Sequence, residues 1–106
     1  KHLKAVDMLS ALAHDTRLTI FKMLVRQGPE GLAAGKISKR LKKASSTVSF
    51  HLAHLTQANL VKAERDGRSI IYRADYESIN AVIGYLRTIA AKEICDHEKI
   101  SRQCGG

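Results

Sequence analysis

The segment "ASSTVSFHLAHL", residues Ala44 to Leu55, decides the fold of this chain. Its apolar residues Val48, Leu52 and Leu55 recur at i, i+4 and i+7, the spacing of one buried helix stripe. The opposite face carries small hydroxyls, one aromatic ring and imidazoles, where a solvated helix usually carries glutamate and lysine. The segment therefore predicts a helix whose outer face is suited to contact a partner.

A second, shorter helix is expected just before this one. Residues 34–41 place Ile37 and Leu41 on an inward face and basic side chains outside. The stretch "KKASS", residues 42–46, then turns the chain, with Ser45 as the expected N-cap of the following helix. The pattern is helix, tight turn, helix.

Two more helices are expected upstream of that pair. Helical spacing of apolar residues runs from Leu3 to Ala13, and a further helix opens after Asp15, which is the expected N-cap. The stretch "QGPEG", residues 27–31, ends this second helix because it contains glycine and proline.

After the central helix the apolar period changes from 3.6 to 2. Residues 61–65 alternate as a strand, "DG" at Asp66 and Gly67 turns the chain, and a returning strand contains Ile70 to Tyr72. This pattern predicts a two-stranded hairpin.

A last long helix is expected from Tyr76, with an unusually apolar inward stripe. The residues of that stripe are Ile79, Val82, Ile83, Leu86, Ile89 and Ala90. The end of the chain has no such stripe and is expected to fray. We therefore expect one domain over residues 1–95 and a flexible, cysteine-containing tail over residues 96–106.

A helix-turn-helix followed directly by a hairpin with a basic tip predicts a mainly α-helical winged helix-turn-helix domain, in which the second helix of the pair enters the DNA major groove. At about 100° per residue, Ser46, Ser49, Phe50 and Ala53 lie opposite the apolar stripe. Such a face can approach DNA closely, donate hydroxyls to phosphates or base edges, and set Phe50 against a thymine methyl group.

The candidate DNA-binding residues are lysines before the helix, polar residues of the helix, and two arginines flanking the hairpin turn, where phosphate or minor-groove contact is expected. They are Lys36, Lys42, Lys43, Ser45, Ser46, Thr47, Ser49, Phe50, His51, His54, Arg65 and Arg68. Alternatively, the serines only cap the helix, Phe50 packs on the preceding helix, His51 is a core histidine, and the turn arginines have no partner.

Composition agrees with a nucleic-acid partner. The 106 residues, 44% hydrophobic, suffice for one domain with a core, and 18 Lys and Arg against 10 Asp and Glu give a net charge of +8. This balance favours a polyanionic partner. The chain has two cysteines, but no apolar run of about 18 residues and no secretory segment. These features predict a reduced cytoplasmic protein with no membrane partner.

Other function classes have weaker support in the sequence. A catalytic reading could assemble Ser49, His51 and Asp66, but there is no nucleophile elbow, phosphate-binding glycine loop or carboxylate pair, so we expect no enzyme. A winged helix used for protein contacts conflicts with the basic recognition face. RNA binding lacks an aromatic stacking sheet.

Three blocks of the chain resemble the diagnostic blocks of the ArsR/SmtB family of bacterial metal- and redox-responsive repressors. They are "LSALAHDTRLTIFKML" (Leu9 to Leu24), "SSTVSFHLAHLTQANLV" (Ser45 to Val61) and "ERDGRSIIYRAD" (Glu64 to Asp75). The resemblance implies a homodimeric repressor that pairs through its first and last helices. The apolar stripe of the last helix independently favours a partner, and a symmetric dimer matches a palindromic operator.

Two inducer sites of that family are absent here. Many of its arsenic sensors carry "CVC" at the start of the third helix, where this chain has "GLAAGKI" at Gly31 to Ile37. Zinc sensors use a carboxylate and histidines on the last helix. The matching positions here hold Tyr76, Ser78, Ile89 and Lys92. A third group, similar to this chain in "EGLAAG" and "STVSFHL", has an adjacent cysteine pair where this chain has Ala90 and Ala91.

The two thiols, Cys95 and Cys104, are the remaining candidate effector ligands. Soft thiolates favour a trivalent arsenical or antimonial, and two thiols suit a methylated arsenical. Zinc is a weaker alternative that could add Asp96, His97 or His2 as ligands. Oxidation of the two thiols to a disulfide, or the absence of any effector, are further alternatives.

Overall fold

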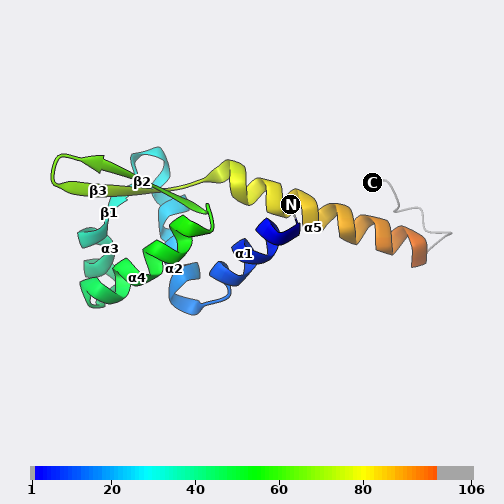
Figure 1. Ribbon diagram of the computed structural model, residues 1–106, viewed down its shortest axis with the longest axis horizontal. Coiled ribbons are helices and arrows are strands. Elements are labelled where there is room, and N and C mark those ends of the chain that lie inside the picture. Colours follow the sequence, from blue (N-terminus) through cyan, green and yellow to red (C-terminus); the bar gives the residue numbers. More distant parts are fainter. Residues whose placement is uncertain (1, 98–106) are drawn as a thin grey trace.

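The computed structural model describes residues 2–97 of the chain, and its side chains from residue 4 to residue 93. The elements in chain order are α1 (His2–Leu12), α2 (Asp15–Gln27), the 3₁₀ turn η1 (Gly28–Glu30), β1 (Leu32–Ala33), α3 (Ala34–Leu41), α4 (Ser45–Gln57), β2 (Val61–Asp66), β3 (Ser69–Ala74) and α5 (Tyr76–His97). Figure 1 shows α2, α3, α4 and the strands gathered at one end, while α5 extends away from them beside α1. The predicted winged helix-turn-helix architecture is confirmed.

The hydrophobic core lies between the helices and the inner end of the sheet. Its largest completely buried side chains are Ile20, Leu24, Ile37, Val48, Leu52, Leu55 and Leu60. Full burial of each such side chain contributes about 1.5–3 kcal/mol relative to leaving it exposed. The apolar stripe of α4 supplies three of these side chains, so the helix is held rigidly while its other face stays outside.

The N-cap predictions for α2 and α4 were each wrong by one residue. His14 caps α2, because its Nδ1 accepts a hydrogen bond from the Thr16 backbone N–H at 3.2 Å, and Asp15 is the first helical residue. Asp15 lies in the first turn, where a carboxylate complements the helix dipole. Ala44 occupies the N-cap of α4 without a side-chain hydrogen bond, and Ser45 is already helical.

The turn between α3 and α4 is fixed by a different serine. The Ser38 hydroxyl donates to the Lys43 carbonyl at 2.6 Å, and the Lys43 N–H donates to the Ser38 carbonyl at 3.2 Å. Lys42, between them, takes the left-handed conformation at φ 56°. These bonds close the turn without help from Ser45.

The sheet has three antiparallel strands in the order β1-β3-β2, and not the two predicted. Leu32 of β1 pairs with Tyr72, and a strand of two residues is too short to show alternation in the sequence. The hairpin loop consists of Gly67 and Arg68, one residue beyond the predicted position, because Asp66 pairs with Ser69. Gly67 supplies the positive φ of 65° that a two-residue loop requires.

The stripe of α5 is not buried in the single chain. Val82 is buried and Ile79 partly so, but Ile83, Leu86 and Ile89 keep more than 40% of their surface exposed. The inward direction predicted for the stripe therefore holds in the single chain for Ile79 and Val82, whereas these three residues and Ala90 lie on its surface. The start of α5 is anchored to α2 because the Tyr76 hydroxyl donates to the Val25 carbonyl at 3.3 Å.

Candidate nucleic-acid interface

The outward face of α4 is exposed as predicted. Its exposed residues are Ser45, Ser46, Thr47, Ser49, Phe50, Ala53 and His54. The helix contains no acidic residue. Within the described part of the chain, the hydroxyls of Ser46 and Ser49 make no hydrogen bond, so they do not cap the helix and are available to a partner. This face is therefore small, polar and free of negative charge.

Phe50 stands out from that face and does not pack into the core. Its side chain is 59% exposed. Its ring meets the His54 ring edge-on at a centroid distance of 4.7 Å and the His51 ring at 5.5 Å. The two imidazoles hold the phenyl ring in place while its outer side remains open, which suits contact with a base methyl group.

His51 is the exception among the predicted interface residues. It is only 7% exposed, so the structure removes it from the outward face and places it in the core. Its Nδ1 lies 3.3 Å from Arg17 Nη1, and its ring lies 4.6 Å from the His14 ring. Burial lowers the pKa of His51 below 6.5, and the neighbouring cationic groups act in the same direction.

The predicted lysines lie around the turn that leads into α4. Lys36 is in the first turn of α3, and Lys42 and Lys43 are in the turn between α3 and α4. All three are exposed, and none has an ion-pair partner among the described side chains. Exposed, unpaired ammonium groups beside an inserted helix are the groups that displace counterions from phosphates.

The hairpin of β2 and β3 forms the wing, and it carries Arg65 and Arg68 at its exposed tip. In Figure 1 this hairpin reaches out at the same end of the molecule as α3 and the start of α4. Arg73 braces the wing. Its Nε donates to the Pro29 carbonyl at 2.7 Å, and its Nη1 forms an ion pair with Glu64. This brace could not be predicted, because no sequence pattern links two residues 44 positions apart.

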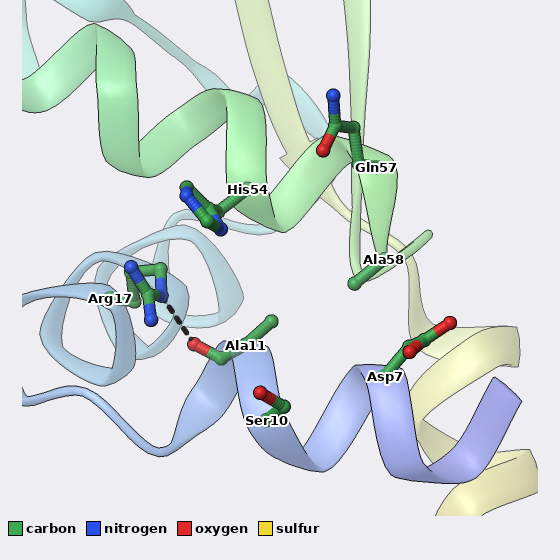
Figure 2. A pocket seen from close by; sticks show the side chains of 7 residues that line it. All are labelled: Asp7, Ser10, Ala11, Arg17, His54, Gln57 and Ala58. Atoms are coloured by element: carbon green, nitrogen blue, oxygen red, sulfur yellow. Dashed lines mark hydrogen bonds between the residues drawn. The ribbon is translucent and has the colours of Figure 1, made fainter. Parts of the chain in front are cut away.

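A pocket of 430 Å³ lies between α1 and the second half of α4 (Figure 2). The residues that line it are Asp7, Ser10, Ala11, Arg17, His54, Gln57 and Ala58. Figure 2 shows the Arg17 guanidinium at one end, where its Nε donates to the Ala11 carbonyl at 2.7 Å. Arg17 was not among the predicted site residues, although it stands in the block from Leu9 to Leu24.

The two cysteines lie outside the described side chains. Cys95 is within the backbone of α5, and Cys104 is beyond residue 97. The boundary expected between residues 95 and 96 falls inside α5, which runs to His97, and the rest of the expected tail is likewise outside the described residues. Among the described residues, no three His, Cys, Asp or Glu side chains gather as a metal site, and no helix could cross a membrane.

Comparison with known proteins places this geometry in a family. The profile of a helix-turn-helix domain family matches residues 12–64, from the end of α1 into β2. An ArsR-like transcriptional regulator from Rhodococcus sp. RHA1 superposes over 96% of both chains with a TM-score of 0.79 at 25% identity. The chain belongs to the ArsR/SmtB family. It is a helix-turn-helix transcriptional regulator of the ArsR type.

Two further proteins match most of the chain. The HTH-type transcriptional regulator YgaV of Escherichia coli is 33% identical over 86 residues, which is 81% of this chain and 85% of YgaV. The homodimeric winged helix-turn-helix domain of Mb0332 from Mycobacterium bovis, a possible ArsR-family regulator, has a TM-score of 0.66 at 26% identity, over 90% of this chain and 85% of that one. YgaV is a transcriptional regulator, and Mb0332 is a possible one.

Proposed function

We propose that this ArsR-family chain acts as a homodimeric repressor that binds a palindromic DNA operator with α4 in the major groove. The observation that carries the proposal is the outward face of α4, which is exposed, free of acids and flanked by unpaired lysines. In this arrangement the serines and Phe50 meet base edges, Lys36, Lys42 and Lys43 bind phosphates, and the wing tip contacts the neighbouring backbone or minor groove.

The dimer would form through α1 and α5. Both helices carry large apolar side chains that are exposed in the single chain: Val6 and Leu9 on α1, and Ile83, Leu86 and Ile89 on α5. Leaving this many large apolar residues in water is unfavourable, and a two-fold interface would bury them against their own copies. The Mb0332 domain is homodimeric, which supports a dimer here.

Sedimentation velocity tests the dimer. Leu86→Glu should shift the protein from dimer to monomer, because it puts a charge into the apolar stripe. Ala91→Glu adds the same charge at an exposed position on the other side of α5, and should remain dimeric. A monomeric wild-type protein, or a Leu86→Glu dimer as tight as the wild type, would remove the dimer from the proposal.

The effector would be a trivalent arsenical or antimonial that binds the thiolates of Cys95 and Cys104. Thiolates are soft ligands, so two of them preferentially bind soft, thiophilic ions. Binding near the end of α5 would shift the dimer interface and favour a geometry that no longer fits the operator. Linkage then requires that operator DNA weaken effector binding by the same factor.

Fluorescence anisotropy tests both parts of the proposal. The reduced protein is first titrated onto duplex DNA from upstream of its own gene. The resulting complex is then titrated with arsenite, antimonite and a methylated arsenical. Release that disappears in Cys95→Ser and Cys104→Ser supports a thiolate sensor. Release by zinc or by diamide supports the metal or the disulfide alternative instead, and binding unmoved by any of them leaves a repressor without these effectors.

RNA binding and protein binding are the rival functions. Duplex DNA binding that weakens steeply with salt and is competed by one sequence over bulk DNA would support the repressor. Equal binding to single-stranded RNA, or no nucleic-acid binding at low salt, would contradict it.

A further inference from the structure

Arg17 connects three helices. It is the third residue of α2, its Nε donates to the Ala11 carbonyl in the last turn of α1 at 2.7 Å, and its Nη1 lies 3.3 Å from Nδ1 of His51 on α4. Figure 2 shows the first of these bonds. A single guanidinium thus bridges a proposed dimerisation helix and the recognition helix.

The hydrogen bond between Arg17 and His51 can run in only one direction. A guanidinium only donates hydrogen bonds, so His51 Nδ1 must be the acceptor. His51 is therefore the neutral tautomer with its proton on Nε2. Burial and the packing of the His14 and Phe50 rings against the imidazole hold it in this position.

The pocket next to this bridge separates α1 from α4 on the side that faces solvent. Asp7 and Ser10 of α1 face it from one side, and His54 and Gln57 of α4 from the other (Figure 2). Apolar packing joins the helices on the inner side, through Met8 and Ala11. Polar side chains of the two helices therefore meet solvent here, and Arg17 supplies the directional link between them.

We infer that Arg17 and His51 are positioning residues that fix the angle of α4 relative to α1 and thereby set the spacing of the two recognition helices in the dimer. The inference rests on the proposed function. Apolar packing tolerates small rotations, whereas a hydrogen bond to each helix restricts them. Without the bridge, each half of the dimer would still bind DNA, but the dimer would accept half-sites at the wrong separation.

The experiment measures tolerance to half-site spacing. The wild-type protein first selects an operator from a randomised duplex library. Its affinity is then measured for that operator and for one with a base pair inserted between the half-sites, which rotates them by about 35° and moves them by about 3.4 Å. We expect the wild type to lose much of its affinity on the operator with the inserted base pair. In His51→Leu the ratio of the two affinities should be about tenfold smaller, which is the scale of one hydrogen bond.

Three variants separate positioning from stability. His51→Asn should restore the wild-type spacing preference, because Asn Oδ1 is an acceptor the same number of bonds from the backbone as His Nδ1. Arg17→Lys should behave like His51→Leu, because an ammonium cannot reach both acceptors in the fixed geometry of a guanidinium, and it serves if His51→Leu does not fold. Ile37→Val, a change to a completely buried residue of α3, a helix that contains neither bridge residue, should keep the wild-type preference at lower stability.

The outcomes distinguish this inference from the proposed function. If the wild type selects paired half-sites but His51→Leu and Arg17→Lys keep its spacing preference, the bridge does not position α4 and only this inference fails. If His51→Asn behaves like His51→Leu, the imidazole acts by packing and the inference also fails. If the wild type selects no paired half-sites, the proposed dimeric repressor fails, and the inference with it.

Discussion

A Cβ atom on Gly31 would lie 2.6 Å from the carbonyl oxygen of Tyr72. Gly31 is buried, its φ is +69°, and it comes directly before β1. The close approach lets β1 pair with β3 and joins the base of the wing to the segment that leads into α3. The angle of the wing relative to the helix-turn-helix thus depends on a residue without a side chain.

Gly31→Ala should destabilise the protein by more than about 1 kcal/mol, because it combines positive φ with a clash against backbone. Gly35→Ala is the matched control: nothing lies within 4 Å of its added Cβ, and alanine in α3 is favoured over glycine by up to about 1 kcal/mol. Urea denaturation of both variants measures the difference. Equal stability of Gly31→Ala and the wild type would contradict the tight contact.

Arg73→Met should loosen the wing with little effect on global stability. The Arg73–Glu64 ion pair is exposed, and such pairs contribute less than about 1 kcal/mol. The bond to the Pro29 carbonyl, however, ties β3 to η1. We expect faster amide exchange in β2 and β3 than in wild type. Glu64→Gln removes the ion pair but leaves the Pro29 bond, so it should exchange like the wild type; the same acceleration in both variants would assign the brace to the ion pair.

How far the sequence predicts this fold depends on the length of each signal. Helical periodicity over eight or more residues predicted α3 with its correct ends and α1 within one residue. β1 has two residues and no periodicity, so its pairing with Tyr72 could not be predicted from the sequence. The N-cap predictions for α2 and α4 failed because the capping position depends on where the preceding turn ends. His14 caps α2, and Ala44, which has no side-chain hydrogen bond, precedes α4.

The exposed surface of the candidate site could be predicted from the sequence, but the hydrogen bonds between its helices could not. The exposed face around Ser49 and Phe50 follows from helical period alone. His51 lies at the edge of the apolar stripe, and its hydrogen-bond partner Arg17 is 34 residues away in the chain, where no sequence pattern indicates it. The stripe of α5 was correctly read as apolar, but its exposure in a single chain required the structure.

The free energy of unfolding should fall as the pH is lowered below 6.5. The pKa of His51 is lowered in the folded state by burial and by the facing groups His14 and Arg17 on the α2 side, His54 on α4 and Lys43 in the turn. The unfolded chain therefore binds the proton more readily, so stability is complete above about pH 6.5 and decreases as the pH falls toward the lowered pKa.

Urea denaturation at pH 7.5 and at pH 5.5 measures this effect. His51→Asn has no proton to gain and should lose less stability than the wild type between the two pH values. Parallel losses in the wild type and in His51→Asn would show that other groups cause the pH dependence.

The wing tip should contribute to DNA affinity through phosphate charge. Replacing Arg65 and Arg68 by alanine should reduce the slope of log K against log salt by about 0.9 for each phosphate contact that is lost. Their exposure predicts no loss of stability. Lys92→Ala, an exposed cation near the end of α5, should leave the slope unchanged. An unchanged slope in the double variant would place the wing tip away from the phosphates.

Dimethyl sulfate footprinting of the selected operator tests most directly whether α4 reads the DNA, because this reagent methylates guanine N7 in the major groove. We expect two symmetric clusters of protected guanines, one helical turn or a small multiple of about 10 base pairs apart, and their loss with Ser49→Glu. Protection on one side only, or tight binding without any major-groove protection, would contradict a dimer that reads DNA with α4.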